Sequence, residues 1–215
     1  MKPRALVLCN GEPPSRVLLG RLRRGVDAVI AADGGANAAR AAGIRPDAII
    51  GDLDSITPAT RRHFASSRII RVQRQDNTDL EKVLDILAAE GFGDVMIAGA
   101  TGRRLDFTLG NLSIAWLYAR KLRLRFVGDG WQAIPLTGRI SMTAPRGTTV
   151  SLVPFGSCSG ISLRGLRYPL TNAALTRGAV AVSNVVVRSP FTVSVRRGRM
   201  LLVVLAAPAE TRLRA

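Results

Sequence analysis

Hydrophobic residues in the first 127 positions form short runs that are separated by longer stretches with helical periodicity. We interpret the apolar runs as strands and the stretches between them as helices. Regular strand–helix alternation is typical of a mostly parallel α/β sheet with helices on both faces. The predicted strands are 5–9, 28–32, 48–50, 69–72, 95–98 and 122–127, and the predicted helices are 36–42, 58–65, 78–89 and 105–119.

From about residue 128 the pattern changes to short β-branched runs punctuated by glycine, proline, serine and threonine. Helical periodicity is absent there, and short strands with turn signals indicate a sandwich or a barrel. We therefore predict an α/β domain over residues 1–130 and an all-β sandwich domain over residues 131–215, with a frayed tail from residue 208. The predicted strands of this second domain are 139–143, 148–153, 160–163, 180–187, 192–195 and 200–205.

Length and composition are those of a globular protein with its own core. The chain has 215 residues, of which 47% are hydrophobic and 21% charged, so a disordered chain is excluded. We expect no membrane-spanning helix and, from the short apolar start, no signal peptide, which favours the cytoplasm. We also expect free thiols at Cys9 and Cys158, and a surface helix position for His63, which has no partners for a zinc site.

The net charge of +16 is concentrated in the second half of the chain. Residues 1–106 hold 16 basic and 13 acidic residues, whereas residues 107–215 hold 15 basic and 2 acidic residues. A basic half could attract nucleic acid, and a nucleic-acid-binding protein is our alternative from a different functional class. Against it, the arginines are dispersed and aromatic residues make up only 5%, whereas such proteins interleave basic residues with stacking aromatics.

Aspartates follow the ends of several predicted strands. Ligands of open parallel sheets bind outside the carboxyl ends of the strands, so we expect these carboxylates to converge at one edge. A cluster of oxygen ligands without histidine or cysteine favours a hard cation, Mg²⁺ first, which commonly completes its coordination with substrate phosphates. The common P-loop and G-x-G-x-x-G nucleotide motifs are absent. The aspartates concerned are Asp33, Asp52, Asp54, Asp76, Asp79 and Asp106.

Some of these aspartates have a structural alternative as helix caps or turn residues. Asp76, shortly before a predicted helix, is the main candidate for a cap. Asp52 and Asp54 are harder to explain by packing, because they stand two positions apart at the exit of an apolar strand. The glycines of 34–35 and 99–102 precede helices and would let backbone amides approach an anion.

Several motifs occur in a fixed order along the chain. They are ADGGAN at 32–37, PD at 46–47 with GDLDS at 51–55, DNTDLEK at 76–82, GATGRRLD at 99–106 and LGNL at 109–112. The second half adds GLRYPL at 165–170, Leu175 with Gly178, Ser183-Asn184 and GRMLLV at 198–203. In this order the motifs resemble the thiamine pyrophosphokinase (thiamine diphosphokinase) family over nearly the whole chain.

The resemblance implies a transferase that uses ATP and Mg²⁺. In this reaction the hydroxyl of thiamine attacks the β-phosphorus of ATP, and the products are thiamine diphosphate and AMP. The resemblance also implies an α/β catalytic domain, a β-sandwich thiamine-binding domain, and a homodimer whose sites are shared between subunits. The nearest alternative is a related pyrophosphokinase that acts on a hydroxymethyl-dihydropterin.

The same resemblance assigns expected roles to residues at matching positions. The expected magnesium ligands are Asp52, Asp54 and Asp79, with Asp76 and Asp106 nearby. The residues expected to contact the nucleotide or its phosphates are Asp33, Gly34, Asn37, Asp76, Thr78 and Arg104. Ser183 and Asn184 are expected to meet the pyrimidine of thiamine. Arg104 would stabilise developing charge, and the general base remains open among Asp54, Asp79 and Asp106.

This chain departs from the family pattern at a few positions. Phe107 stands where many members have histidine, Arg103 replaces a glycine, and Val185 replaces a glutamate. Val185 has no polar group, so it cannot make the contacts to thiamine that a glutamate would make. No tryptophan follows the Ser-Asn pair, so aromatic stacking on the substrate would need Trp131 or Phe191, for which core packing is the alternative.

Overall fold

The structure of the protein is a computed structural model that describes residues 2–73, 76–176, 181–206 and 211–214. The chain divides into two compact units, Met1–Asp129 and Gly130–Ala215.

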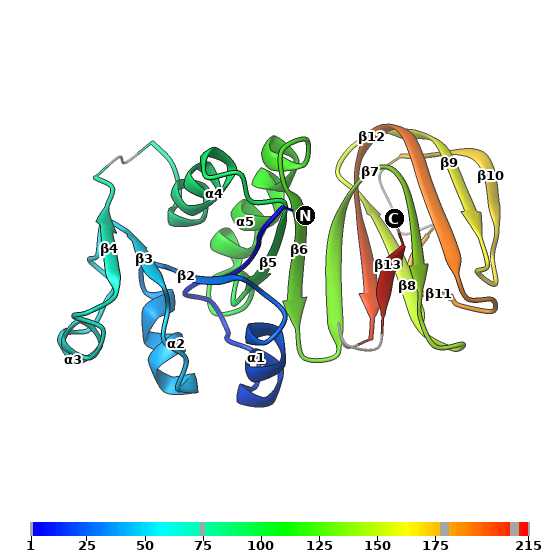
Figure 1. The fold of residues 1–215 in the computed structure, drawn as a ribbon. Helices are drawn as coiled ribbons and strands as arrows, with labels where there is room; N and C mark the ends of the chain where they lie inside the picture. The colour runs from blue at the N-terminus through cyan, green and yellow to red at the C-terminus, as the bar shows by residue number, and fades with distance from the viewer. Residues whose placement is uncertain (1, 74–75, 177–180, 207–210, 215) are drawn as a thin grey trace. The chain divides into compact units, whose positions relative to one another are not determined.

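A parallel sheet forms the centre of the first unit, with the strand order β6-β5-β1-β2-β3-β4 (Figure 1). Every neighbouring pair in this order is parallel. The strand order changes direction beside β1, and ligands of such sheets bind at this switch point, outside the carboxyl ends of the strands. The strands are β1 Arg4–Leu8, β2 Ala28–Ala32, β3 Ala48–Gly51, β4 Arg68–Arg71, β5 Asp94–Ala98 and β6 Arg123–Gly128.

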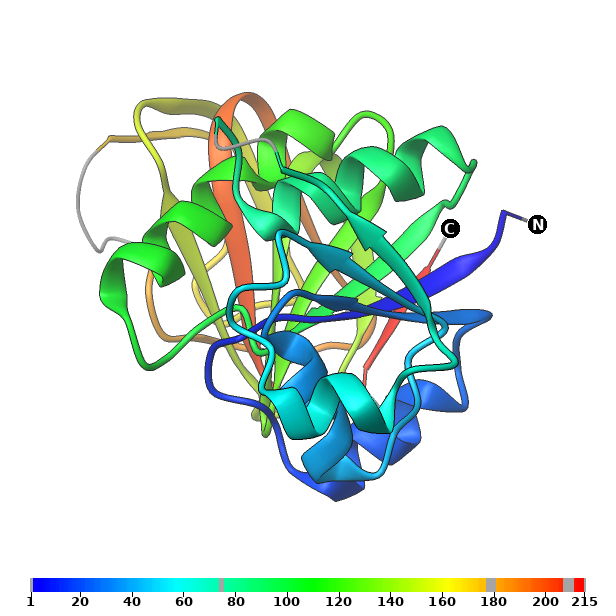
Figure 2. The same ribbon diagram turned by 90° about the vertical axis from the view of Figure 1, so that its left-hand side faces the viewer.

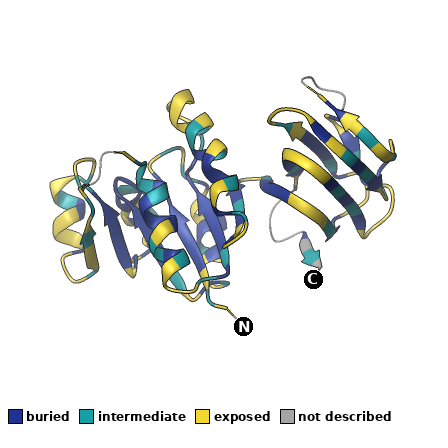
Figure 3. Ribbon diagram, turned by 90° about the horizontal axis from the view of Figure 1, so that it is seen from above, coloured by how far each residue is buried: buried dark blue, intermediate teal, exposed yellow. Residues whose placement is uncertain are grey.

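Helices cover both faces of this sheet, as the strand–helix alternation predicts. Figure 2 shows α1, α2 and α3 on one face and α4 and α5 on the other. Figure 3 shows that the sheet is buried and that the helices turn exposed residues outward. The helices are α1 Arg16–Arg23, α2 Gly35–Ala42, α3 Pro58–His63, α4 Asp79–Ala89 and α5 Leu105–Tyr118.

The helix α4 illustrates how the sequence produces this packing. Leu80, Val83, Leu84 and Leu87 recur at helical spacing, and all four are at most 3% exposed. Burying each of them contributes about 1.5–3 kcal/mol. On the other face, α2 packs closely through Ala36 and Ala39.

The second unit is antiparallel throughout. The long strand β12 pairs with β7, β8 and β9, and its register shifts between Val195 and Met200. This unit has its own core, which includes Phe191, Val193 and Leu202. The strands are β7 Trp131–Thr143, β8 Thr149–Pro154, β9 Cys158–Arg164, β10 Leu170–Leu175, β11 Asn184–Val185, β12 Phe191–Leu205 and β13 Arg212–Arg214. The chain therefore has a mixed α/β fold whose strands are first parallel and then antiparallel.

Several elements differ from the sequence prediction. The helix α1, the strand β10 and the first half of β7 were not predicted, and the two predicted strands 192–195 and 200–205 form one strand, β12. Of the predicted strand 180–187, residue 180 lies outside the described residues, and only Asn184–Val185 forms a strand. The expected fraying is wrong for Arg212–Arg214, because backbone pairing with β7 orders this segment.

Two simpler expectations are confirmed. Cys9 and Cys158 are free and buried, and His63 is an exposed residue at the end of α3. Within the described part of the chain, no helix combines the length and apolar character needed to cross a membrane.

Candidate active site

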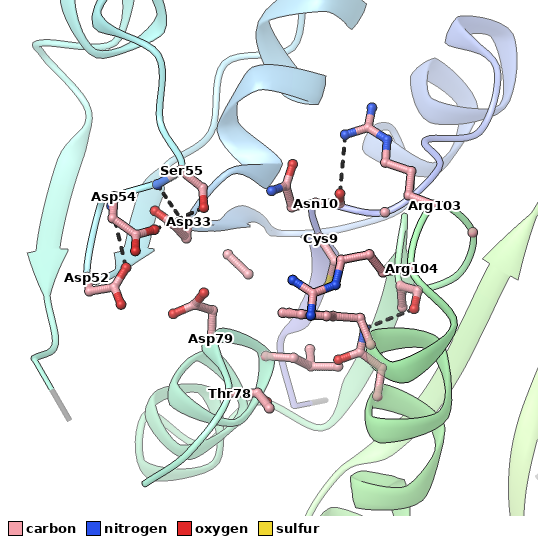
Figure 4. Close-up of a pocket in the computed structure, with 17 residues that line it drawn as sticks. Cys9, Asn10, Asp33, Asp52, Asp54, Ser55, Thr78, Asp79, Arg103 and Arg104 are labelled. Atoms are coloured by element: carbon pink, nitrogen blue, oxygen red, sulfur yellow. Dashed lines mark hydrogen bonds between the residues drawn. The ribbon is translucent and has the colours of Figure 1, made fainter. Parts of the chain in front are cut away.

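A cavity of about 500 Å³ opens where β1, β2 and β3 end and where α4 and α5 begin (Figure 4). All the residues that line it belong to the first unit. They are Cys9, Asn10, Gly11, Ala32, Asp33, Asp52, Asp54, Ser55, Thr78, Asp79, Leu80, Ala100, Gly102, Arg103, Arg104, Phe107 and Asn111.

Three carboxylates gather on one side of this cavity. Asp33 follows β2, while Asp52 and Asp54 follow β3, and one oxygen atom from each lies within 4.8 Å of the others. Ser55 connects them, because its amide donates to Asp33 Oδ2 at 3.2 Å and its hydroxyl donates to Asp54 Oδ1 at 2.9 Å. The predicted convergence of carboxylates is therefore present for these three residues.

The carboxylate of Asp33 is held in an unusual environment. The residue is only 2% exposed and has a positive φ of 42°. Burial raises the pKa of its carboxyl above the ordinary value, and the negative charge of Asp79 raises it further. The hydrogen bond from Ser55 lowers the pKa but does not offset these two effects. Among the described residues, none donates a hydrogen bond to its Oδ1. A buried carboxylate oxygen of this kind, beside two other carboxylates, fits a hard cation.

Asp79 is placed by the start of α4. Thr78 caps this helix through a capping box with Glu81, so Asp79 is the first helical residue. Lys82, one turn further along, donates to Asp79 Oδ1 at 2.9 Å and lies 3.9 Å from Asp52 Oδ2. Thr78, rather than Asp76, is therefore the cap, because its hydroxyl accepts from the amide of Glu81.

Two arginines face the cavity from the loop before α5. The guanidinium of Arg104 lies 4.4 Å from the ring centre of Phe107 and forms two hydrogen bonds with Asp106, at 2.6 and 3.2 Å. The hydrogen bonds from Arg104 lower the pKa of the Asp106 carboxyl. Asp106 itself does not line the cavity. Arg103 donates to the carbonyl oxygen of Asn10 at 3.3 Å, so the extra charge predicted beside the site is present.

Three other residues assigned to the nucleotide do not line the cavity. Asn37 holds the loop after β3, because its amide donates to Ser55 O and its Oδ1 accepts from the amide of Thr57. Gly34 is the N-cap of α2 and lies directly against the side chain of Asn10, where a larger residue would collide. Asp76 is exposed and does not line the cavity.

The two residues assigned to thiamine lie in the second unit. Ser183 is exposed and has a positive φ of 62°. The side chain of Asn184 is buried and bridges the backbone of Tyr168, accepting from its amide at 3.0 Å and donating to its carbonyl at 2.8 Å. Phe191 is fully buried in the core, so it is not available for stacking, and Trp131 is half-buried.

Sequence reasoning missed several residues of the cavity. Asn10 follows β1 just as Asp33 follows β2, so the strand-end rule applied to Asp33 also finds it. Asn111 lies within α5 and donates to Ala100 O at 2.9 Å, a contact that the LGNL motif does not by itself specify. Cys9 lines the cavity, but burial raises the pKa of its thiol to about 12, so it is not a nucleophile at neutral pH.

Two family descriptions match the chain. "Thiamin pyrophosphokinase, catalytic domain" covers residues 19–126, and "Thiamin pyrophosphokinase, vitamin B1 binding domain" covers residues 138–200. Together they span most of the sequence, and the first lies within the unit that contains the cavity.

Individual relatives agree with these descriptions. Thiamine pyrophosphokinase of Bacillus subtilis (strain 168) is 30% identical over 171 residues, which are 75% of this chain and 79% of that protein. Thiamine pyrophosphokinase 1 of Oryza sativa subsp. japonica is 28% identical over 158 residues, which are 66% of this chain and 60% of the plant protein.

Solved structures show the same fold. The crystal structure of the thiamine pyrophosphokinase from Bacillus subtilis has a TM-score of 0.83 at 23% identity, over 95% of this chain and 99% of that one. The enzyme from Candida albicans has a TM-score of 0.83 at 18% identity, over 95% and 89%. With both family descriptions matched in order, and with the motif resemblance confirmed, the chain belongs to the thiamine pyrophosphokinase family.

Proposed function

We propose that the protein is a Mg²⁺-dependent thiamine diphosphokinase, which transfers the diphosphoryl group of ATP to the hydroxyl of thiamine and releases AMP. The observation that carries this proposal is the group of Asp33, Asp52 and Asp54 at the edge of the cavity. In a chain of this family, such a group supports a metal-assisted transfer of phosphate rather than a binding function alone.

The donor set fits a magnesium ion. Asp52, Asp54 and Asp79 are the proposed ligands, and Asp33 joins them because its Oδ1 is buried beside Asp52 and Asp54 without a donor among the described residues. All these ligands are carboxylate oxygens, which Mg²⁺ prefers. When bound, Mg²⁺ would neutralise the phosphate oxygens of ATP and help to orient them.

Residues around the carboxylates would position the nucleotide. Arg104 is held by Asp106 and lies against Phe107, so its guanidinium is fixed at the cavity, where it would stabilise charge on the transferred group. Thr78 would act indirectly by fixing the first turn of α4, and Asn37 by holding the loop after β3.

A carboxylate would accept the proton of the thiamine hydroxyl. Asp54 and Asp79 line the cavity, whereas Asp106 does not and is already hydrogen-bonded to Arg104. This geometry favours Asp54 or Asp79 over Asp106 as the general base.

We extend the proposal to the second unit and to the assembly. Residues 1–130 would be the catalytic domain, and residues 131–215 a β sandwich that binds thiamine, with Ser183 at its surface and Asn184 shaping the loop at Tyr168. Two copies would form a homodimer with sites at the subunit interface. The free cysteines are compatible with action in the cytoplasm.

The alternative functions receive less support. Both matched descriptions name thiamine, which favours it over a hydroxymethyl-dihydropterin as the acceptor. The carboxylates that line the cavity also disfavour nucleic acid as its ligand. In the absence of metal, their negative charges repel the negatively charged phosphates of a nucleic acid.

The decisive experiment measures AMP and thiamine diphosphate formed from ATP, thiamine and Mg²⁺. We expect equal amounts of the two products, no turnover with EDTA, and no turnover by Asp52→Ala. Glu90→Gln, which alters an exposed carboxylate that pairs with Arg68, is the matched control and should remain active. AMP formation only with the pterin alcohol would overturn the acceptor, and no AMP with either alcohol would overturn the proposed function.

A further inference from the structure

Lys82 is a buried lysine next to the carboxylate cluster. Only 3% of its side chain is exposed, although lysine is almost never fully buried unless it is paired. Its Nζ atom lies 2.9 Å from Asp79 Oδ1 and 3.9 Å from Asp52 Oδ2. Lys82 is not one of the residues that line the cavity, so its ammonium contacts the two carboxylates from the protein interior.

This contact connects two structural elements. Lys82 and Asp79 lie three positions apart on α4, whereas Asp52 belongs to the loop that follows β3. The helix α4 packs against β3, and the ammonium lies at the point where the two elements deliver their carboxylates. Lys82 is therefore placed to fix Asp52 relative to Asp79.

The cavity is rich in negative charge, and Lys82 supplies a positive charge next to it. Four carboxylates lie around one side of the cavity, and like charges at this distance repel one another. In the part of the chain that the structure describes, no arginine or other lysine forms a salt bridge with any of the four. The four carboxylates are those of Asp33, Asp52, Asp54 and Asp79.

We propose that Lys82 is a positioning residue that acts as the permanent counter-charge of this cluster. It holds Asp52 and Asp79 in place without a metal, and it lowers the negative charge that the cluster presents to a divalent cation. The free protein therefore binds Mg²⁺ more weakly than the carboxylates alone would allow, which favours arrival and departure of the ion with the nucleotide. This inference rests on the proposed Mg²⁺-dependent function.

Manganese binding to the free protein tests the charge effect directly. Mn²⁺, added without nucleotide and followed by electron paramagnetic resonance, reports cation affinity independently of turnover. We expect Lys82→Met to bind Mn²⁺ roughly tenfold more tightly than the wild type, because one positive charge beside the site is removed. Lys82→Arg, which keeps the charge, should lie closer to the wild type than Lys82→Met does.

Lys121→Met is the matched control, because it removes the same charge from an exposed lysine that does not line the cavity. It should bind Mn²⁺ as the wild type does. Unchanged or weaker Mn²⁺ binding by Lys82→Met would overturn the proposal.

A second measurement keeps the proposal testable if Lys82→Met folds poorly. Lys82 is buried, and the side chain of Asp79 is only partly exposed. Removing one partner of such an ion pair leaves an uncompensated charge, whereas removing both partners does not. We therefore expect Lys82→Met to melt at a lower temperature than the wild type, and the double variant Lys82→Met/Asp79→Asn to recover part of the loss. A double variant that is no more stable than Lys82→Met would contradict the role of counter-charge. Failure of the proposed function is distinguishable, because it would appear as absent AMP formation in the wild type.

Discussion

Under the proposed function, the side chain of Asp33 would serve binding at the expense of stability. Its carboxylate is buried, close to Asp52 and Asp54, and its pKa is raised chiefly by burial. A raised pKa means that the folded state favours the neutral acid. The ionised form therefore costs stability once the pH exceeds the ordinary carboxyl range, and the cost is absent below it.

We predict that Asp33→Asn stabilises the metal-free protein and weakens its binding of Mn²⁺. At pH 7.5 its melting temperature should exceed that of the wild type by about 2–4 °C, which corresponds to about 1 kcal/mol in a protein of this size. The difference should shrink as the pH is lowered, because the raised pKa lets the wild-type carboxyl of the folded protein take up a proton before an ordinary carboxyl does. Thermal melts in EDTA across this pH range check the prediction, and a variant less stable than the wild type at pH 7.5 would contradict it.

The departures from the family pattern also act at the level of single residues. Phe107 is half exposed and supports the guanidinium of Arg104, a contact that a sequence pattern does not specify. Asn184 matches the family pattern, but its side chain is hydrogen-bonded to the backbone of Tyr168. Its proposed role toward thiamine is therefore to shape a loop.

At the level of the elements, the first turn of α4 links helix stability to the site. The capping box of Thr78 and Glu81 fixes the start of the helix, and Asp79 is the next residue. The helix also buries its apolar face, so the orientation of this carboxylate depends on a well-packed element rather than on a loop.

We predict that Thr78→Ala lowers both stability and turnover. Loss of the cap should cost about 1 kcal/mol, and kcat should fall because Asp79 and Lys82 are no longer held by a regular first turn. Urea unfolding and steady-state kinetics measure the two effects.

Ser15→Ala is the matched control for this prediction. Ser15 caps α1 and does not line the cavity. This variant should lose comparable stability and keep its kcat. An equal loss of kcat in both variants would show that general destabilisation, not the position of Asp79, accounts for the effect.

At the level of the whole molecule, the two units differ in secondary structure and in charge. The cavity with its carboxylates lies in the first unit, whereas the residues assigned to thiamine lie in the second. Under the proposed function, a subunit contributes its first unit to one site and its second unit to another.

We predict that two inactive variants complement each other. Asp52→Ala should disable the catalytic unit, and Ser183→Tyr should block the proposed thiamine surface without disturbing a buried position. The two variants are mixed and refolded together so that subunits exchange. If sites are shared across a dimer, half of the dimers contain one subunit of each kind, and one of the two sites in such a dimer is intact. The mixture should therefore regain about a quarter of wild-type activity.

Activity assays of the mixture, together with light scattering for the mass, check this prediction. The subunit mass is 23.0 kDa, so a dimer is readily distinguished from a monomer. A dimer whose mixture stays inactive would contradict shared sites, and a monomer would contradict the proposed assembly.

The amino-acid sequence by itself determined the order of elements in the first unit. Apolar runs, helical periodicity and the glycine at position 43, which ends α2 with a φ of 71°, are local signals, and the structure follows them closely. The helix α1 was missed although Ser15 caps it and Leu18, Leu19 and Leu22 form its buried face. The strand β13 was missed because its order comes from pairing with β7, which is distant in sequence.

In the candidate site, too, local sequence signals predict some features and tertiary packing decides the others. Strand-end aspartates are visible in the sequence, because the direction of parallel strands fixes which edge they share. Tertiary structure brought Asp33 from the end of β2 to Asp52 and Asp54 at the end of β3. Asp106 instead pairs locally with Arg104, two positions away in the sequence. Lys82 ends the DNTDLEK motif but has no role assigned by the sequence, and only the packing of α4 against β3 brought its charge to Asp52. Distances between side chains from separate elements depend on packing, and no local pattern records them.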